Sequence, residues 1–185
     1  VVDGYSASAS GAYILDIQIF NEGETSTEAP TPTPGDTPTP SDLEGDTCGT
    51  AIDATGGGSF TGDTTGFTND YSTATAPDGG SCTGFGVAGP DVVYSVDVLA
   101  GDEVSASLTS AYDGSLWLSN DCGALGDSCQ VGDDGAFSGG VEDVVYTALE
   151  DGTLYIVVDG YSASTQGTYS LAITVGDGAP PPPGD

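Results

Sequence analysis

The charged side chains of this sequence, which are the ones best suited to binding ions, are all carboxylates. Its 185 residues include 29 Asp plus Glu and no Lys, Arg or His, which gives a formal net charge of −29 at pH 7. No internal salt bridge between side chains can form, and carboxylates at this density repel one another unless salt or bound cations offset the repulsion. The chemistry that the sequence offers is therefore cation binding, with divalent ions as the natural partners.

The missing basic residues also exclude whole classes of function. Nucleic-acid binding needs Lys or Arg against phosphate, and an anionic membrane surface attracts the same residues. Ser162 and Asp159 could provide a nucleophile and a carboxylate, but there is no His to activate the serine. We therefore expect no enzyme, no nucleic-acid partner and no membrane insertion.

Four cysteines, Cys48, Cys82, Cys122 and Cys129, predict disulfide bonds in an oxidising extracellular or cell-surface setting. A zinc site is the rival interpretation, but the usual CxxC spacing and any His are absent. Three pairings are possible in principle. The spacing favours Cys122 with Cys129, which bracket a short turn-rich loop, and this leaves Cys48 to pair with Cys82.

An internal repeat organises the chain. Residues 1–19 and 157–175 are identical at 12 of 19 positions, including an unbroken VVDGYSAS. With no initiator Met and no signal-like segment, we interpret residues 1–19 as the C-terminal hairpin of a preceding repeat in an excised or processed chain. Such a hairpin is marginal alone, so we expect it to contact a different unit through Val1, Val2, Tyr5, Tyr13, Leu15, Ile17 and Ile19.

Proline-rich segments follow each copy of this hairpin. Nine of the 11 prolines lie in residues 28–41 and 179–185. We interpret residues 20–43 as an extended linker of polyproline II character and residues 177–185 as the start of the next linker. A more specific interpretation is that this linker also carries O-linked sugar on threonines. The candidates beside proline are Thr31, Thr33, Thr37 and Thr39, and Thr25 and Thr27 are further candidates.

Residues 44–176 show strand and turn patterns throughout. Apolar residues alternate in 92–98 and 104–108, which we expect to form a hairpin, and the remaining strands are expected at 115–119, 141–149, 154–158 and 168–175. The pattern predicts an all-β fold, an antiparallel β-sandwich of about eight strands. Trp117 is expected in the core; the alternative is an aromatic platform for sugar or collagen, formed with Tyr71, Tyr112 and Tyr161.

Several motifs in this order resemble a known family. DTCGTAID, GPDVVYSVDVLAGDEVSASLTS, EDGTLYIVVDGYS and GTYSLAITV together resemble the bacterial pre-peptidase C-terminal domain, from Gly45 to Val175. The resemblance implies a jelly-roll-like β-sandwich of the kind appended to secreted proteases and repeated in surface proteins.

The resemblance also implies Ca²⁺ as a cofactor, because the clostridial collagen-binding domains are relatives that bind calcium through acidic residues. The matching positions are Glu44, Asp46 and Asp91, and Asp63, Asn69 and Asp70 are expected to complete the site from a loop. The alternative is that each acid is a solvated turn residue. A second candidate group is Asp121, Asp133 and Asp134.

Two interpretations of function follow. The first is a structural repeat unit of an extracellular filament, stalk or adhesin, whose partners are copies of itself joined head to tail. The second is a calcium-dependent binding module for an insoluble polymer, collagen or polysaccharide, appended to a secreted hydrolase. This second interpretation is an argument from fold.

Overall fold

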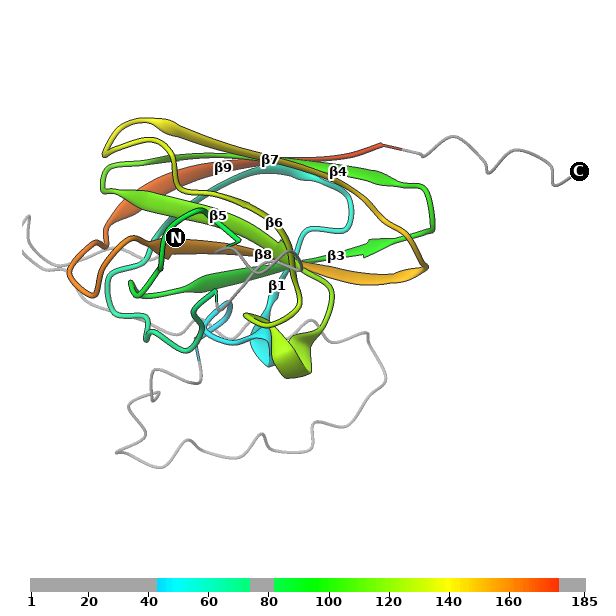
Figure 1. The fold of residues 1–185 in the computed structure, drawn as a ribbon, viewed down its shortest axis with the longest axis horizontal. Coiled ribbons are helices and arrows are strands. Elements are labelled where there is room, and N and C mark those ends of the chain that lie inside the picture. The colour runs from blue at the N-terminus through cyan, green and yellow to red at the C-terminus, as the bar shows by residue number, and fades with distance from the viewer. Residues whose placement is uncertain (1–42, 74–81, 177–185) are drawn as a thin grey trace, which may run out of the picture. The chain divides into compact units, whose positions relative to one another are not determined.

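The structure, a computed structural model, describes residues 43–73 and 82–176 (Figure 1). These residues form nine strands and two short 3₁₀ turns. In chain order the elements are η2 (Cys48–Thr50), β1 (Ile52–Asp53), β2 (Gly58–Asp63), β3 (Val92–Val98), β4 (Glu103–Ser110), β5 (Gly114–Ser119), η3 (Cys122–Ala124), β6 (Cys129–Asp133), β7 (Val141–Thr147), β8 (Gly152–Gly160) and β9 (Thr168–Gly176).

The strands form two sheets that pack face to face, so the predicted all-β sandwich is confirmed (Figure 1). One sheet has five strands in the order β1-β3-β8-β5-β6, and the other has four in the order β2-β9-β4-β7. All pairs are antiparallel except β1 with β3, which is parallel.

The expected hairpin between residues 92–98 and 104–108 is wrong. β3 pairs with β8 in the five-stranded sheet, whereas β4 pairs with β7 and β9 in the other. The segment 157–175, expected as a hairpin, also crosses between the sheets, because β8 and β9 belong to different ones. Each strand has one strongly apolar face, and a turn that crosses the sandwich lets two such faces meet in the core, which a flat hairpin cannot do.

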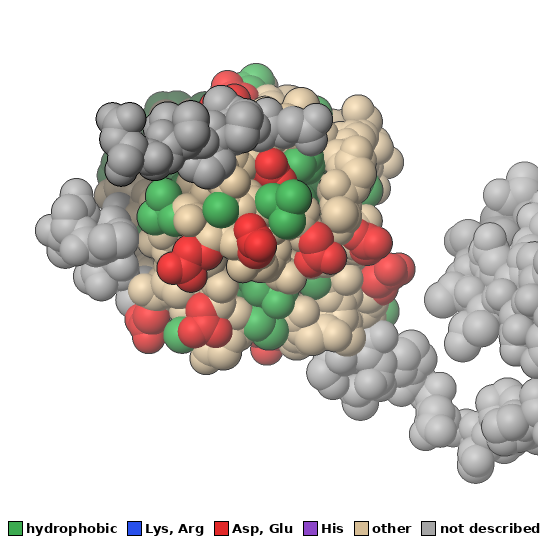
Figure 2. All heavy atoms as spheres, turned by 90° about the vertical axis from the view of Figure 1, so that its right-hand side faces the viewer, with side chains coloured by type: hydrophobic (Ala, Val, Ile, Leu, Met, Phe, Trp, Pro, Cys, Tyr) green, Lys and Arg blue, Asp and Glu red, His purple; other side chains and the backbone are tan. Residues whose placement is uncertain are grey.

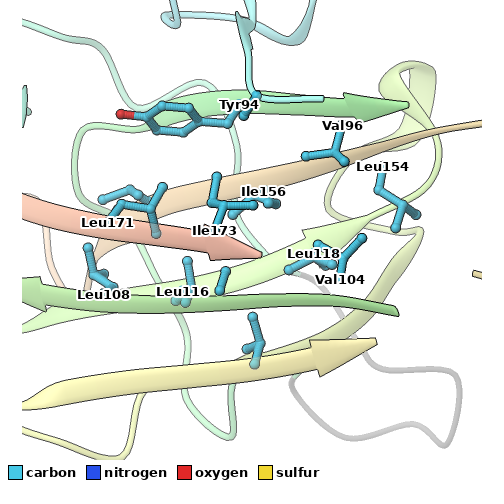
Figure 3. Packing of buried hydrophobic residues seen from close by; sticks show 14 of the residues in the cluster. Tyr94, Val96, Val104, Leu108, Leu116, Leu118, Leu154, Ile156, Leu171 and Ile173 are labelled. Atoms are coloured by element: carbon cyan, nitrogen blue, oxygen red, sulfur yellow. The ribbon is translucent and has the colours of Figure 1, made fainter. Parts of the chain in front are cut away.

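The main core lies between the sheets (Figure 3). Along β4, Val104, Ala106 and Leu108 point inward and are at most 2% exposed, while the alternate residues are polar. Leu171 of β9 and Ile156 of β8 meet them from both sheets. Alternation with period two therefore determines which face of each strand is buried.

A second, smaller apolar cluster covers the outer face of the five-stranded sheet. Trp117 and Val157 are fully buried there, against Leu125 and Cys129. All six residues of β5 are buried because the strand is covered on both faces. The prediction that Trp117 is a core residue is confirmed, and the aromatic platform is wrong, since Tyr112 is also buried, with 7% exposure.

Candidate functional site

Two buried carboxyl groups face each other at one end of the five-stranded sheet. Asp91 directly precedes β3 and Asp159 lies near the end of β8; because Val92 pairs with Val158, the antiparallel register places the two aspartates opposite each other. Both residues have 0% exposure. Acidic side chains are almost never fully buried unless they are paired with an opposite charge, so two adjacent aspartates without access to solvent are an unexpected feature.

Half of the oxygens in this pair are satisfied by backbone amides. The N–H groups of Asp70 and Tyr71 both donate to Asp91 Oδ2 at 2.7 Å. The N–H of Gly160 donates to Asp159 Oδ1 at 2.6 Å. The other two oxygens, Asp91 Oδ1 and Asp159 Oδ2, are buried and have no conventional donor among the described residues.

Burial and mutual repulsion keep this pair from ionising fully. Burial is the main cause that raises the pKa of Asp91 to about 7. Burial first, and then the neighbouring Asp91, raise the pKa of Asp159 well above its ordinary value. The indole N–H of Trp117 lowers the pKa of Asp159 slightly, although it makes no hydrogen bond of full geometry. Two adjacent carboxyls in such a site hold one proton between them or require a cation.

Further acids lie beside the pair, connected through Thr68. Its N–H and hydroxyl donate to Asp46 Oδ1 at 3.1 Å and 3.3 Å, and its hydroxyl also donates to Asp70. The carbonyl of Thr68 accepts from the N–H of Asp91 at 3.0 Å. Asp46 is fully buried, whereas Asp70 is exposed. We call Asp46, Asp70, Asp91 and Asp159 the acidic corner.

The acidic corner contains three of the six residues expected to bind calcium. Glu44 is exposed and separate, and Asp63 lies at the end of β2, where it accepts from the N–H of Thr65 at 2.8 Å. Asn69 donates to the carbonyl of Ala88 at 3.1 Å. Sequence reasoning missed Asp159, which the pairing of β3 with β8 would have placed opposite Asp91.

The second group of residues expected to bind calcium is not brought together by the fold either. Asp121 caps η3 by accepting from the N–H of Gly123 at 2.8 Å. Asp133 instead accepts from the N–H groups of Gly135 and Asp143. Asp134 is buried beside other carboxyls and forms part of a separate recess described below.

The donor set of the acidic corner fits a hard cation in type and in charge. Its two orphaned oxygens belong to buried carboxyls, and Ca²⁺ prefers oxygen ligands. Calcium takes about six to eight such ligands. Within residues 43–73 and 82–176, no three acidic, Cys or His side chains are already arranged around one point as metal ligands. Asp46 and Asp70 are the side chains that would add oxygens to those of Asp91 and Asp159.

All four cysteines form disulfides, as expected, but the favoured pairing is wrong. Cys48 is bonded to Cys122 and Cys82 to Cys129. The reason is tertiary: both bonds tie loops over the outer face of the five-stranded sheet, beside Trp117. The short loop between Cys122 and Cys129 is instead organised by η3 and by the bond from Ser128 N–H to the carbonyl of Ala124.

The surface of the sandwich is acidic without any basic counterpart. Figure 2 shows the end that lies to the right in Figure 1, where acidic and apolar side chains alternate. Leu99 and Leu149, in the turns after β3 and β7, are 63% and 78% exposed. Acids at this end, such as Glu150 and Asp151, are exposed to water and salt, unlike Asp46, Asp91 and Asp159 of the acidic corner.

Several predicted residues lie outside the described part of the chain. These are the expected inter-unit contacts Val1, Val2, Tyr5, Tyr13, Leu15, Ile17 and Ile19, and the glycosylation candidates Thr25, Thr27, Thr31, Thr33, Thr37 and Thr39. The linkers 20–43 and 177–185 also lie outside it, apart from Leu43. In the described residues, no helix is long and apolar enough to cross a membrane.

Comparison with known proteins finds similarity in structure only. No protein-family model and no curated sequence matches the chain. Among solved structures, the pre-peptidase C-terminal domain of collagenase from Bacillus anthracis is similar with a TM-score of 0.43 and 14% identity, over 67% of this chain and 94% of that one. PliG of Aeromonas hydrophila, a periplasmic inhibitor of g-type lysozyme, is similar with a TM-score of 0.42 and 15% identity, over 68% of this chain and 95% of that one. The first of these structures carries the family name that the sequence motifs indicate.

Proposed function

We propose that this chain is a structural repeat unit of an extracellular tandem-repeat protein, a filament, stalk or adhesin, in which sandwiches are joined head to tail through Pro/Thr-rich linkers. The observation that carries the proposal is the distribution of differences between residues 1–19 and 157–175. The seven positions that differ are all exposed or partly exposed in the second copy: Thr165, Gln166, Thr168, Ser170, Ala172, Thr174 and Val175.

The identical positions include every buried residue of that segment. Tyr169, Leu171 and Ile173, which point into the core from β9, have Tyr13, Leu15 and Ile17 as their counterparts. Val157 to Gly160, buried at the end of β8, have Val1 to Gly4. Two copies that share a core-facing pattern and differ on the solvent face are what packing in equivalent sandwiches requires.

The position of the second copy argues for a second sandwich. β8 lies between β3 and β5, and β9 between β2 and β4, so residues 157–175 supply an inner strand to each sheet. These places are already filled in the described sandwich. Residues 1–19 therefore belong to another unit, either in one continuous chain or as strands donated to a neighbour. Repeated head-to-tail contact of this kind produces an open array.

The proposal includes calcium, which is the cation that neutralises the acidic corner. Asp3 is the counterpart of Asp159, so the repeated segment carries one half of the carboxyl pair into each unit. The two disulfides fit an oxidising compartment outside the cytosol. A unit that is cross-linked by disulfides and neutralised by extracellular cations suits a load-bearing role.

The test is an extended chain in which residues 44–156 are fused in front of residue 1, so that residues 1–19 follow them as residues 157–175 do in the described domain. We expect two sandwiches, and therefore a calorimetric unfolding enthalpy about twice that of the 185-residue chain, because this enthalpy scales with the number of folded residues. Differential scanning calorimetry measures it directly.

Two matched substitutions in the leading copy serve as controls. Leu15→Asp, at the counterpart of buried Leu171, should reduce the enthalpy to that of one sandwich. Gln18→Asp, at the counterpart of exposed Thr174, should leave it doubled. An extended chain with the enthalpy of a single sandwich would show that residues 1–19 are not a strand pair of this fold, and would favour the polymer-binding module.

A further inference from the structure

A small recess opens at the end of the sandwich where β5 begins and β6 and β8 end. Its volume is about 320 Å³, and its aromatic walls are Phe85, Phe137 and Tyr161. These side chains are 56%, 84% and 48% exposed, although large apolar side chains are usually covered. The rings of Phe85 and Tyr161 meet edge to face, with centroids 6.4 Å apart. We call this the aromatic recess.

Carboxyl groups complete the lining of the aromatic recess. Asp113 and Asp134 both line it, and Asp113 is held there because its carbonyl accepts from the N–H of Tyr161 at 3.1 Å. Asp134 is only 6% exposed, and its Oδ2 has no hydrogen-bond partner among the described residues. Burial and the nearby carboxylates, Asp113 first, raise the pKa of Asp134 to about 7. The recess therefore combines an unpartnered buried carboxyl with a strongly negative environment.

The neighbouring acids are already used by the backbone. Glu142 accepts from the N–H groups of Gly135 and Ala136 at 3.0 Å and 2.8 Å. Asp133 accepts from Gly135 and from Asp143. Asp113 and Asp134 are thus the two side-chain carboxylates left for a ligand, fewer oxygens than a calcium ion takes.

Aromatic walls around a carboxylate suit an organic cation better than a metal or a neutral ligand. An ammonium or guanidinium group gains from ring faces through cation–π attraction and from carboxylates through charge-assisted hydrogen bonds. Its aliphatic stem can pack against Phe137, and a recess of about 320 Å³ has room for one long side chain. The chain cannot supply such a group itself, since it has no Lys, Arg or His.

We propose that the aromatic recess binds a lysine or arginine side chain presented by a partner protein. The charge on the two sides is complementary, because Asp113 and Asp134 both line the recess and neutralise the cation. Phe85, Phe137 and Tyr161 cover the stem and give the contact its apolar area. The recess would make the acidic chain a receptor for basic proteins at one defined point, rather than over its whole surface.

The test titrates the ¹⁵N-labelled 185-residue chain at pH 8 in 150 mM NaCl with three probes, followed by NMR. The probes are N-acetyl-lysine methylamide, its uncharged isostere N-acetyl-norleucine methylamide, and a short lysine-containing peptide. We expect saturable shifts at residues 113, 134–137 and 161 for both lysine probes, with dissociation constants in the millimolar range, and at least tenfold weaker binding of the norleucine compound.

Two substitutions locate the binding. Asp134→Asn, which removes the charge at almost constant shape, should weaken lysine binding about tenfold, and Phe137→Ala should weaken it severalfold. Glu150→Gln removes one charge from the turn before β8, at the opposite end of the sandwich, and should change nothing. Equal binding of norleucine, equal loss in Glu150→Gln, no saturation by lysine, binding of the small compound without the peptide, or displacement of lysine by millimolar calcium at the recess would each overturn the proposal.

Discussion

With chelator present, the stability of the oxidised chain should fall as the pH rises from 5 to 7. The cause is the Asp91 and Asp159 pair, whose pKa values are raised by burial, to about 7 for Asp91. A carboxyl that is more basic in the folded state stabilises the fold below its unfolded pKa near 4, and this stabilisation disappears as the pH rises through the folded value. Well below the folded pKa each pH unit removes about 1.4 kcal/mol per carboxyl, and less as that pKa is approached, so Asp91 alone accounts for about 2 kcal/mol. The melting temperature should fall by roughly 10 °C.

Substitutions and calcium binding distinguish the effect of this pair on stability from that of general repulsion between carboxylates. Asp159→Asn keeps a hydrogen-bonding side chain beside Asp91 but removes one acid, so it should stabilise the chain at pH 8 and reduce the fall. Glu150→Gln removes an exposed charge and should leave the fall unchanged. Asp134 and Glu142 have raised pKa values too, which is why part of the fall should persist in Asp159→Asn.

Calcium should reverse the fall at pH 8, because a ligand that binds only the folded state stabilises it by about 2.7 kcal/mol at a hundredfold excess over its dissociation constant. The same ion should have little effect on Asp159→Asn. If NaCl at high concentration restores stability as well as calcium does, the effect is screening, and the acidic corner is not a specific site. A melting temperature that is flat between pH 5 and pH 7 would contradict the raised pKa values themselves.

The sequence predicts the strands far better than it predicts their pairing. Alternation locates β3, β4, β5, β7, β8 and β9, because burial on one face leaves a period of two in the residues. It misses β1, β2 and β6, and the residues of β1 and β2 are mostly Gly, Ser, Thr and Asp. It also mistakes the turn after β3, which crosses the sandwich, for a hairpin turn, since both kinds of turn are short and contain Gly.

The sequence is limited in the same way in predicting which acids form the acidic corner. The family resemblance gives Asp46 and Asp91 as calcium ligands, so their involvement could be predicted, but Glu44 and Asp63 are expected with them and are not part of the acidic corner. Asp46 and Asp91 differ from Glu44 and Asp63 because they are buried. The burial of Asp91 depends on the loop 68–71 folding over it. The position of Asp159 opposite Asp91 follows only from the register of β8 on β3. In a chain with 29 acids, composition cannot identify the few that are desolvated.

Charge distribution explains why so acidic a chain can still fold. Among the described residues, most acids lie at exposed positions in turns or at strand ends, where water and salt reduce their repulsion. The cost of folding is concentrated in the few buried carboxyls of the acidic corner and the aromatic recess. An extracellular environment rich in cations favours the folded state at the first of these, and a basic partner favours it at the second.

Opening either disulfide should destabilise the domain by about 4 kcal/mol, because the bonds close long stretches of chain, with sequence separations of 74 and 47 residues. Peptide mapping under non-reducing conditions should join Cys48 to Cys122 and Cys82 to Cys129. Trypsin cannot be used, since the chain has no Lys or Arg, so cleavage at acidic or aromatic residues is required. A peptide joining Cys48 to Cys82 would contradict the pairing described above.

The effect should be visible at a single fluorophore. Trp117, the one tryptophan of the chain, lies under the loops that both disulfides hold on the outer face of the five-stranded sheet. Reduction should shift its emission to the red at denaturant concentrations where the oxidised chain is still folded, because the loops can then separate from the sheet and admit water. The double variant Cys48→Ala with Cys122→Ala should show this shift without a reductant. If Trp117 stays blue-shifted until the main core unfolds, the outer cluster and the core form one cooperative unit, and the disulfides stabilise both together.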